Sequence, residues 1–452
     1  MQKIIPIYYS EYGRYINRFR AIPSYIDGLK PVERRLLLTL HKVAKKDLVK
    51  SAEAVGHCMG NYHPHGDQSI YKTLVNLVNQ GYATKQGNWG AVGLKNDPPA
   101  GMKYTECKLE KWVEELAFTY IDYVPYDEFE LKPEPIYLPC PIPIGLIGHG
   151  TTTGISFYRT LIPKYKLKDL AGRLFGLLDK KSDKVITPDF KGCAIRELSP
   201  DQIKSILSTG SGTLNVVPNG RLEAKCIKIL GRVPDATFDS LVEHSDELEV
   251  SLNDDSPTAE DIEITVEPRK RGLNLTTLGS KIWNDYLIKN LNISCLFSDN
   301  EGKVQLCGID DILLNNYNLW KYSAKLKRVD DYNKLSNRKF EYMIVQIIRY
   351  IFEQYKCNKI SEVIDKYKEL KKTSEINVEI DNYNIDTDKW SKEIKNVTDQ
   401  DITDMCSKRT IKNLIETTID MQKVENEILS AKAAIASSES DSFKHIGQLK
   451  GV

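Results

Sequence analysis

The N-terminal quarter of the 452-residue sequence reads PVERRLLLTLHKV from Pro31, SAEAVGHCM from Ser51 and DQSIYKTLVNLV from Asp67. Pro31 suits the first turn of a helix, and Asp67 suits the N-cap of another. Leucine, isoleucine and valine recur at helical spacing in the first and third segments. The middle segment predicts a short helix that ends at Gly60. We therefore expect three short helices joined by tight turns.

This quarter is also the basic part of the chain. Residues 1–111 contain 17 Lys and Arg residues against 9 Asp and Glu residues, although the whole chain has a net charge of only +1. A local excess of positive charge is expected where a surface meets phosphates. Three short helices, a tight turn and a basic surface resemble a helix-turn-helix or winged-helix module. The alternative is that these charges lie on solvated helix faces.

The rest of the chain changes character twice. From residue 135, Pro, Gly, Ile and Val residues punctuated by turns predict an α+β segment, with a hairpin over residues 213–230. The last 125 or so residues are helical in pattern and rich in Lys and Glu. The sequence therefore predicts three domains, over residues 1–134, 135–325 and 326–452.

Two apolar rows in the last domain predict a pair of long antiparallel helices. The rows consist of Phe340, Ile344, Ile347 and Ile351, and of Leu414, Met421, Ile428 and Ile435. Such spacing is typical of a coiled-coil seam. The separation of the rows leaves residues 358–410 as a small helical tip. Ordinary amphipathic core helices would give the same pattern.

Composition excludes several classes of protein. No apolar run approaches the ~20 residues of a membrane-spanning helix, and the first residues do not form a signal peptide. The nine cysteines include no C-x-x-C pair and no spacing typical of zinc sites. No phosphate-binding loop motif is present, so any ATP must bind to another chain. We expect a soluble cytoplasmic protein, associated with the nucleoid or acting in a host cytoplasm.

Two short runs could carry chemistry. In the first, His63 and His65 flank a proline just before a helix N-terminus, where backbone N–H groups favour an anion. These histidines could instead be core residues. In the second, Tyr104 follows Lys103 in a basic, Gly-rich surround, and a nearby cation favours the phenolate form of a tyrosine nucleophile. Packing is the alternative role for any one of the 24 tyrosines.

Four motifs in order resemble the breakage-reunion subunit of type IIA DNA topoisomerases, the A subunit of gyrase and topoisomerase IV. Residues 20–35 contain RAIP and DGLKPVERR, similar to the family's R-A-[LI]-P and D-G-L-K-P-V-x-R-R. Residues 62–67 read YHPHGD, residues 86–90 read QGNWG, and residues 102–106 read MKYTE. These are similar to Y-H-P-H-G-D, Q-G-N-[FW]-G and M-R-Y-T-E. The match is strong over residues 15–110 and only architectural in the second half.

The resemblance implies an enzyme that cuts both strands of a duplex, passes a second duplex through the break and reseals it. Tyr104 would attack a DNA phosphate and form a 5′-phosphotyrosine link, assisted by groups that neutralise charge. Ile155 would wedge between base pairs and bend the cut duplex. The residues implied for catalysis are Tyr104, Lys103, Arg20, His63 and His65, and those implied for DNA binding are Lys30, Arg34, Arg35 and Ile155.

The resemblance also implies an architecture and partners. We expect a multidomain α+β homodimer with a winged-helix DNA-cleavage domain, an α+β tower, and antiparallel coiled-coil arms with a small helical dimerisation tip. Mg²⁺ and ATP are expected on a separate gyrase B-like ATPase/TOPRIM subunit, because this sequence carries no motif for either. The chain stops soon after the second arm, a compact form without the family's C-terminal β-pinwheel that would suit a phage enzyme.

Four positions depart from the family pattern, one of them being Glu33, which stands where the family often has His or Gln. Lys103 stands where the family usually has Arg, which replaces a bidentate fork by a point charge. Gln68 and Lys72 stand where bacterial enzymes generally carry the Ser and acidic residue that anchor quinolones through a metal. A non-catalytic DNA-binding or regulatory protein with this fold is the alternative function, favoured by Lys103 and opposed by the intact Tyr104. The sequence does not distinguish relaxation, decatenation and supercoiling.

Overall fold

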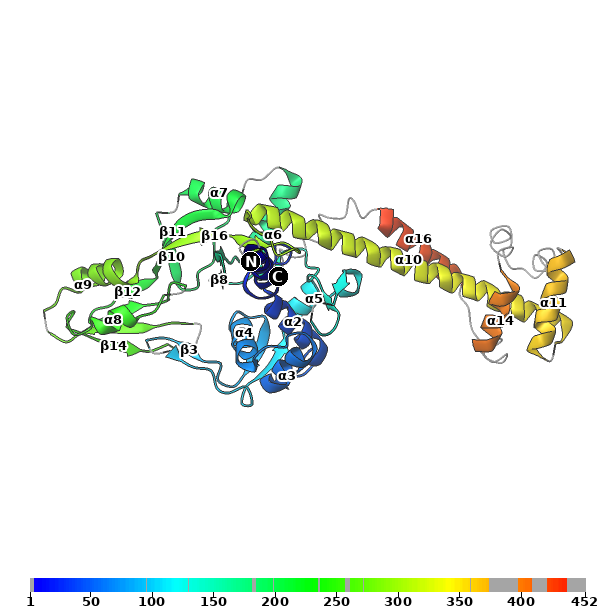
Figure 1. The fold of residues 1–452 in the computed structure, drawn as a ribbon, viewed down its shortest axis with the longest axis horizontal. Helices are drawn as coiled ribbons and strands as arrows, with labels where there is room; N and C mark the ends of the chain where they lie inside the picture. The colour runs from blue at the N-terminus through cyan, green and yellow to red at the C-terminus, as the bar shows by residue number, and fades with distance from the viewer. Residues whose placement is uncertain are drawn as a thin grey trace. The chain divides into compact units, whose positions relative to one another are not determined.

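The chain has a mixed α/β fold. The computed structural model describes residues 4–94, 96–128, 130–180, 184–197, 199–234, 236–256, 261–270, 272–357, 359–373, 397–408 and 421–436. The chain divides into two compact units, one extending through Ala324 and the other beginning at Lys325. Figure 1 labels the elements of both. No helix among the described residues is long and apolar enough to span a bilayer.

The first part of unit 1 is mainly helical. Its elements are α1 (Ile4–Ile16), η1 (Asn17–Ala21), α2 (Pro31–Val43), β1 (Val49–Lys50), α3 (Ser51–Asn61), α4 (Asp67–Asn79), β2 (Ala83–Gln86), β3 (Ala91–Val92), β4 (Asn96–Asp97), β5 (Glu106–Leu109), α5 (Lys111–Ala117), η2 (Ile121–Tyr123), β6 (Tyr126–Asp127) and β7 (Glu134–Pro135).

The three predicted helices are confirmed as α2, α3 and α4, which pack against one another (Figure 1). Their boundaries differ slightly from the prediction. Helix α3 continues past Gly60 to Asn61, and Asp67 is the first residue of α4 rather than its cap, which is Gly66. Strands β1, β5 and β2 form a small antiparallel sheet beside the helices.

The second part of unit 1 is built on two antiparallel sheets. Its elements are η3 (Ile144–Leu146), β8 (Thr151–Ile155), β9 (Arg159–Pro163), α6 (Leu167–Asp179), β10 (Cys193–Arg196), α7 (Pro200–Thr209), β11 (Ser211–Pro218), β12 (Gly220–Leu222), β13 (Ile227–Ile229), α8 (Asp239–Glu243), β14 (Val250–Asp254), β15 (Ile264–Pro268), α9 (Leu275–Ile282), η4 (Trp283–Leu287), β16 (Lys289–Ser294), β17 (Leu296–Ser298) and β18 (Val304–Leu306). One sheet has the order β10-β11-β16-β9-β8 and the other the order β12-β13-β15-β14.

The predicted hairpin over residues 213–230 is wrong. Strand β11 pairs with β10 and β16, whereas β12 pairs with β13 in the other sheet. The chain changes sheets at Gly220, where a Cβ atom would lie 2.2 Å from the ring of Trp283. The Trp283 indole also donates a hydrogen bond to the carbonyl of Pro218 at 2.9 Å. This tryptophan therefore occupies the space at the crossing between the two sheets.

Two hydrophobic clusters stabilise unit 1. The larger runs from Ile26 to Trp320 and includes buried residues on both sides of residue 134. The smaller joins the four-stranded sheet to α8 and α9, and Leu94 of the β3–β4 hairpin packs against it. The predicted boundary at 134/135 is thus not a break in the core.

Unit 2 is helical. Helix α10 (Ile309–Tyr355) begins in unit 1 and continues into unit 2, which also contains α11 (Ile360–Thr373), α14 (Asp399–Lys408) and α16 (Met421–Ala436). Arg328 donates a hydrogen bond to the carbonyl of Ala434, and Lys339 lies 3.8 Å from Glu425. Residue numbers rise along α10 from Arg328 to Lys339, whereas those of their partners in α16 fall from Ala434 to Glu425. The two helices therefore run antiparallel.

The predicted seam residues of α10 have a different role from the one expected. Ile344, Ile347 and Ile351 are buried in a cluster with residues of α11 and α14, such as Tyr367 and Ile402. They form the core of a small helical bundle rather than a seam with α16. Of the second row, Leu414 lies outside the described residues, as do residues 374–396 and 409–420 of the predicted tip and its flank.

Candidate functional site

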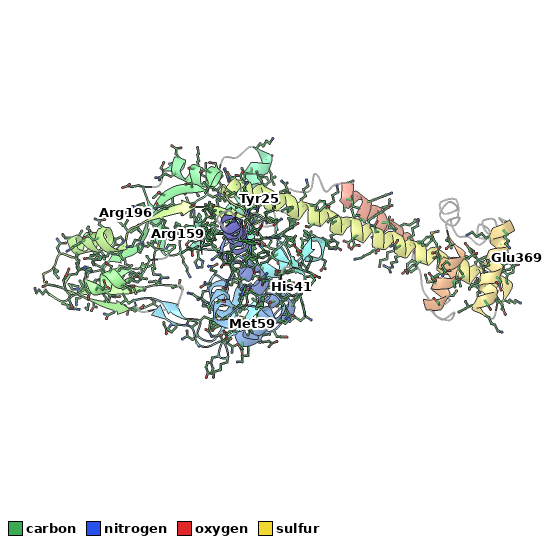
Figure 2. The ribbon with its side chains drawn as sticks, viewed as in Figure 1. Tyr25, His41, Met59, Arg159, Arg196 and Glu369 are labelled. Carbon is green, nitrogen blue, oxygen red and sulfur yellow. The ribbon has the colours of Figure 1, made fainter. Side chains whose placement is uncertain are left out.

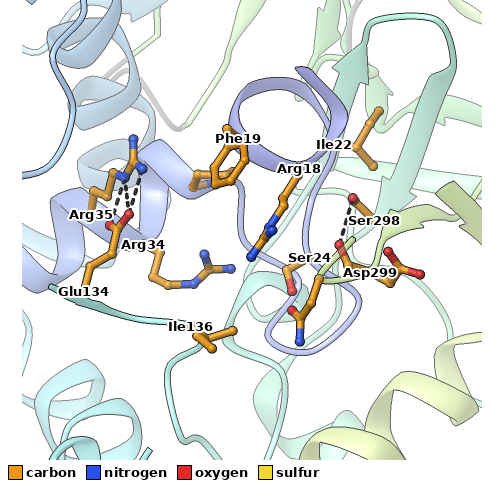
Figure 3. Close-up of a pocket in the computed structure, with 12 residues that line it drawn as sticks. Arg18, Phe19, Ile22, Ser24, Arg34, Arg35, Glu134, Ile136, Ser298 and Asp299 are labelled. Carbon is orange, nitrogen blue, oxygen red and sulfur yellow. Dashed lines mark hydrogen bonds and ion pairs between the residues drawn. The ribbon is translucent and has the colours of Figure 1, made fainter. Parts of the chain in front are cut away.

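The YHPHGD run links α3 to α4 and places the imidazole of His63 in contact with the buried guanidinium of Arg35. His63 is 5% exposed, and its Nδ1 lies 2.7 Å from Nη1 of Arg35. Arg35 also donates from Nε and Nη2 to the carboxylate of Glu134, at 2.8 and 2.7 Å, and from Nη1 to Glu130 at 3.1 Å. Figure 3 shows the pairing of Arg35 with Glu134. The guanidinium is therefore neutralised inside the protein.

This contact determines the chemical form of His63. A guanidinium has donors only, so Nδ1 of His63 must accept the hydrogen bond and Nε2 carries the ring hydrogen. Burial lowers the pKa of His63 to about 3, with further lowering by Arg35, His65 and Arg20. The ring is then neutral near pH 7. Near pH 7 His63 can therefore offer a hydrogen bond from Nε2, whereas its predicted role in neutralising charge would need a protonated ring.

His65 completes the cluster with two residues that sequence reasoning missed. Its ring meets that of His63 edge to face at 4.4 Å, and its Nε2 lies 3.7 Å from Oε1 of Glu130 without a hydrogen-bond partner in the described chain. Tyr15 of α1 donates from its hydroxyl to the same Glu130 oxygen at 3.1 Å. Burial and this hydrogen bond raise the pKa of Tyr15. No pattern in the sequence connects Tyr15 with Glu130, which lies 115 residues away.

Arg20 and Lys30, two of the predicted phosphate contacts, have no ion-pair partner among the described residues. Arg20, in the last turn of η1, is exposed and makes no ion pair among the described residues, yet it is close enough to lower the pKa of His63. Lys30 is half-buried at the start of α2, where its backbone N–H donates to Glu33 at 2.8 Å. The Lys30 ammonium likewise has no ion-pair partner in the described chain. Both side chains can therefore contact a phosphate.

Arg34 and Arg35, which were predicted to contact DNA, are buried in this structure. Arg34 is 7% exposed and donates from Nε and Nη2 to the two oxygens of Asp27, at 2.6 and 2.9 Å. Asp27 is fully buried and also accepts the backbone N–H of Leu138 at 3.1 Å. Both arginines are thus interior residues with carboxylate partners, and they line a small pocket below η1 (Figure 3).

Tyr104 lies on a loop that is anchored on both sides of it. Its ring is 64% exposed, 4.7 Å from the ammonium of Lys103, and its hydroxyl has no hydrogen bond among the described residues. Its backbone N–H donates to Gly101 at 2.8 Å, and Thr105 is buried. Gly87 of the QGNWG run has φ +96°, and a Cβ there would lie 2.8 Å from the Tyr104 carbonyl. The loop is held while the phenol faces solvent.

Tyr104 and the histidine cluster lie at opposite ends of α3. The N–H of Ser51, at the first turn, donates to the carbonyl of Thr105 at 2.9 Å. The N–H of His63, beyond the last turn, donates to the carbonyl of Cys58 at 2.9 Å. A helix of this length separates its ends by about 15 Å. One chain therefore does not bring Tyr104 into contact with His63.

Ile155, the predicted wedge, is the most exposed apolar side chain of the β8–β9 hairpin. It ends β8 and is 73% exposed. Arg159 begins β9 on the other side of the turn and is also exposed (Figure 2). An apolar side chain of this kind, presented beside a cation, is free to contact a ligand.

The cluster has the residue types of a metal site but is unsuited to one. His63, His65 and Glu130 offer ligand atoms within 4.8 Å of one another. A metal at Nε2 of His63 would require the hydrogen to move to Nδ1, where it would point at the donors of Arg35. The set also has only one oxygen ligand, whereas Mg²⁺ prefers several. The arrangement fits an anion that accepts hydrogen bonds better than it fits a cation.

Comparison with known proteins identifies related sequences. The family model for the A subunit of DNA gyrase/topoisomerase IV matches residues 20–445. The chain is 30% identical over 350 residues to the A subunit of DNA topoisomerase 4 from Staphylococcus epidermidis, covering 69% of this chain and 42% of that protein. It is 30% identical over 344 residues to the Staphylococcus aureus protein of the same name, covering 68% and 41%. The matched region thus spans about two-fifths of these relatives.

Proposed function

Because the chain belongs to the family of DNA gyrase and topoisomerase IV A subunits, we propose that it is the DNA cleavage-reunion subunit of a type IIA topoisomerase. One observation carries the proposal most directly. Tyr104 presents an exposed hydroxyl with no hydrogen bond among the described residues, on an anchored loop beside the Lys103 ammonium. A phenol in this position can reach a phosphate without first breaking protein contacts.

In the proposed reaction Tyr104 loses its proton and its oxygen attacks phosphorus. The bond from phosphorus to the 3′ oxygen breaks, that oxygen takes a proton, and a 5′-phosphotyrosine ester forms. The ester conserves the energy of the phosphodiester, so the 3′ hydroxyl can reseal the strand by the reverse step. In phosphoryl transfer the protein contributes mainly positioning of the reacting groups and electrostatic stabilisation of the transition state.

The remaining groups would stabilise the phosphate. Arg20 and Lys103 would supply positive charge, and His63 would donate one hydrogen bond from Nε2. The depressed pKa of His63 supports this role, because a neutral ring with a fixed hydrogen stays a donor over a wide pH range. His65 lies against His63 and would extend the same surface.

A homodimer would complete this site. Within one chain, Tyr104 and His63 are anchored at opposite ends of α3, about 15 Å apart by the rise of the helix. A second copy that presents its Arg20 and His63 to the first copy's Tyr104 would bring all groups to one phosphate. Two such sites in the dimer would cut the two strands of a duplex.

The proposed architecture follows the family. Residues 1–134 would form the winged-helix cleavage domain, residues 135–325 the tower, and residues 326–452 the coiled-coil arms with a dimerising tip near 358–410. A separate ATPase/TOPRIM subunit would bind ATP and Mg²⁺.

The test is a cleavage assay that combines an end-labelled duplex with the chain and its partner subunit. Tyr104→Phe should give no covalent complex on a denaturing gel, while Tyr322→Phe, a similarly exposed tyrosine, should cleave normally. Covalent complex formed by Tyr104→Phe would refute the assignment. If the unmodified chain binds DNA but never forms the complex, it is the alternative, a non-catalytic DNA-binding protein.

A further inference from the structure

The β8–β9 hairpin leaves Ile155 free and holds the residues on either side of it. Ile155 is 73% exposed, whereas Gly154 before it is buried and Ser156 after it is half-buried. The turn itself closes with a hydrogen bond from the N–H of Ser156 to the carbonyl of Tyr158 at 2.9 Å. The N-terminal helix, which consists of α1 and its continuation η1, holds Gly154 and Ser156 in place.

The hairpin approaches the N-terminal helix most closely at Gly154. A Cβ atom on this residue would lie 2.4 Å from the carbonyl oxygen of Ala21, the last residue of η1. Only glycine fits at such a backbone contact. The residue immediately before Ile155 is therefore pressed against the end of the helix.

The residues that follow Ile155 also contact the N-terminal helix. The hydroxyl of Ser156 donates to Oδ1 of Asn17 at 2.5 Å, and Asn17 is 5% exposed. The ring of Phe157 meets that of Tyr9 edge to face at 5.1 Å. A Cβ on Gly13 would lie 3.2 Å from the same Phe157 ring, so the ring lies directly on the helix backbone.

The contacting residues of the helix are evenly spaced. Tyr9, Gly13, Asn17 and Ala21 follow one another at intervals of four, which places them on one face of a helix. Asn17 also lies 3.5 Å, through Nδ2, from the carbonyl of Gly302. Gly302 in turn packs so closely on the carbonyl of Arg14 that a Cβ there would lie 2.2 Å away. The helix is thus fixed to a second segment while it supports the hairpin.

We propose that α1 and η1 are a brace that holds the hairpin so that Ile155 can enter the DNA stack. The proposal rests on the proposed function and on the wedge role that the family resemblance implies for Ile155. Unstacking a base step costs a few kcal/mol, and a wedge can impose it only if its support does not yield. Asn17, Gly13 and Tyr9 are then positioning residues, which act on DNA through Ile155 without touching it.

The first test needs no DNA. Amide hydrogen exchange of residues 154–159, except Phe157, whose own N–H donates to Oγ of Ser156, should be at least ~5-fold faster in Asn17→Ala and in Ser156→Ala, because both lose the hydrogen bond between Ser156 and Asn17. Asn17→Asp keeps the acceptor for Ser156 but loses the Nδ2 donor to Gly302, so its exchange should fall between that of Asn17→Ala and that of the unmodified chain. Tyr8→Ala is the matched control, since Tyr8 is 68% exposed on the same helix and has no partner among the described residues. Unchanged exchange in both Asn17→Ala and Ser156→Ala would overturn the brace.

The second test measures bending by energy transfer between the ends of a labelled duplex, in the Tyr104→Phe background with the partner subunit. The brace predicts that Asn17→Ala and Ser156→Ala lower the bent fraction toward that of Ile155→Ala. Affinity for a duplex with a gap at the bend should stay unchanged, because flexible DNA needs no wedge. Normal bending by both variants, when Ile155→Ala bends poorly, would overturn the proposal.

The two tests separate this inference from the proposed function. If Ile155→Ala itself bends DNA normally, the wedge role implied for Ile155 is wrong, whereas the assignment of Tyr104 as nucleophile is untouched. Fast exchange of residues 154–159 in Asn17→Ala would then still support a helix that holds the hairpin. Gly13→Leu gives an independent check from the helix side, since its side chain would displace Phe157 without removing any hydrogen bond.

Discussion

Arg35 donates a hydrogen bond to Nδ1 of His63 across 2.7 Å, so the form of the imidazole is determined by a residue 28 positions earlier. The same guanidinium contacts Glu130 and Glu134, and all of these groups are largely withdrawn from water. His63 is therefore neutral and keeps its hydrogen on Nε2. This relationship leads to a pH dependence that can be measured on the isolated chain.

Stability should fall as the pH drops below about 6.5, the pKa of an unperturbed histidine, because of His63. Its folded pKa of about 3 is below the unfolded value, so between these limits the unfolded chain binds more protons. Acid therefore favours unfolding in that window. His63→Asn removes the titration, and the variant should be destabilised less, relative to the unmodified chain, at pH 5 than at pH 7. Urea unfolding at the two pH values measures the difference, and an equal difference at both would contradict the burial of a neutral ring.

Arg34→Ala should destabilise the fold by roughly 3–5 kcal/mol, because it leaves the carboxylate of Asp27 buried without its partner. Arg34→Lys keeps the charge but not the two parallel hydrogen bonds, so an intermediate loss is expected. Thermal or denaturant unfolding of the unmodified chain, Arg34→Lys and Arg34→Ala gives their order of stability. Equal stability of Arg34→Ala and the unmodified chain would mean that Asp27 is not buried as described.

Lys30→Ala should act on DNA binding and leave stability nearly unchanged. The Lys30 ammonium has no ion-pair partner among the described residues, so its removal leaves no buried charge. Loss of one phosphate contact should lower the slope of log affinity against log salt by about 1. A salt titration of duplex binding measures the slope, with the exposed Lys372 of α11 mutated to Ala as the control. An unchanged slope would remove Lys30 from the DNA interface.

The sequence allowed local features to be predicted better than long-range partners. Helices α2, α3 and α4 follow from short apolar patterns around each residue, whereas Ile155 was identified only through the family resemblance. The burial of Arg35 was not foreseen, because a basic helix face does not reveal that Glu134 lies against Arg35 from 99 residues away. The change of sheet at Gly220 likewise depends on Trp283, which no turn signal includes.

Changing Lys103 to Arg should speed DNA cleavage in the presence of the partner subunit. Lys103 lies 4.7 Å from the Tyr104 ring and offers a point charge, whereas a guanidinium can donate two parallel hydrogen bonds to one phosphate. A single-turnover cleavage assay with Lys103→Arg and Lys103→Ala should place the unmodified chain between the two. A rate for Lys103→Ala equal to that of the unmodified chain would show that this cation takes no part in the reaction.

Weak sensitivity to fluoroquinolones is expected from the surface of α4. In related bacterial enzymes these drugs act through a metal bridge that needs a hydroxyl and a carboxylate one helical turn apart. Because α4 begins at Asp67, Gln68 and Lys72 lie on its exposed face at the required spacing, but they carry an amide and a cation. The cation of Lys72 would repel the metal that the drug carries.

The double change Gln68→Ser with Lys72→Asp should therefore raise drug-stabilised cleavage, since it restores both groups without altering the helix. Each single change alone should have a smaller effect, because the bridge needs both of its anchors. Counting cleaved complexes over a range of drug concentrations, with Thr73→Ser on the same helix as the control, measures the gain. Potent poisoning of the unmodified chain, at concentrations that affect bacterial gyrase, would show that the drug binds here without this bridge.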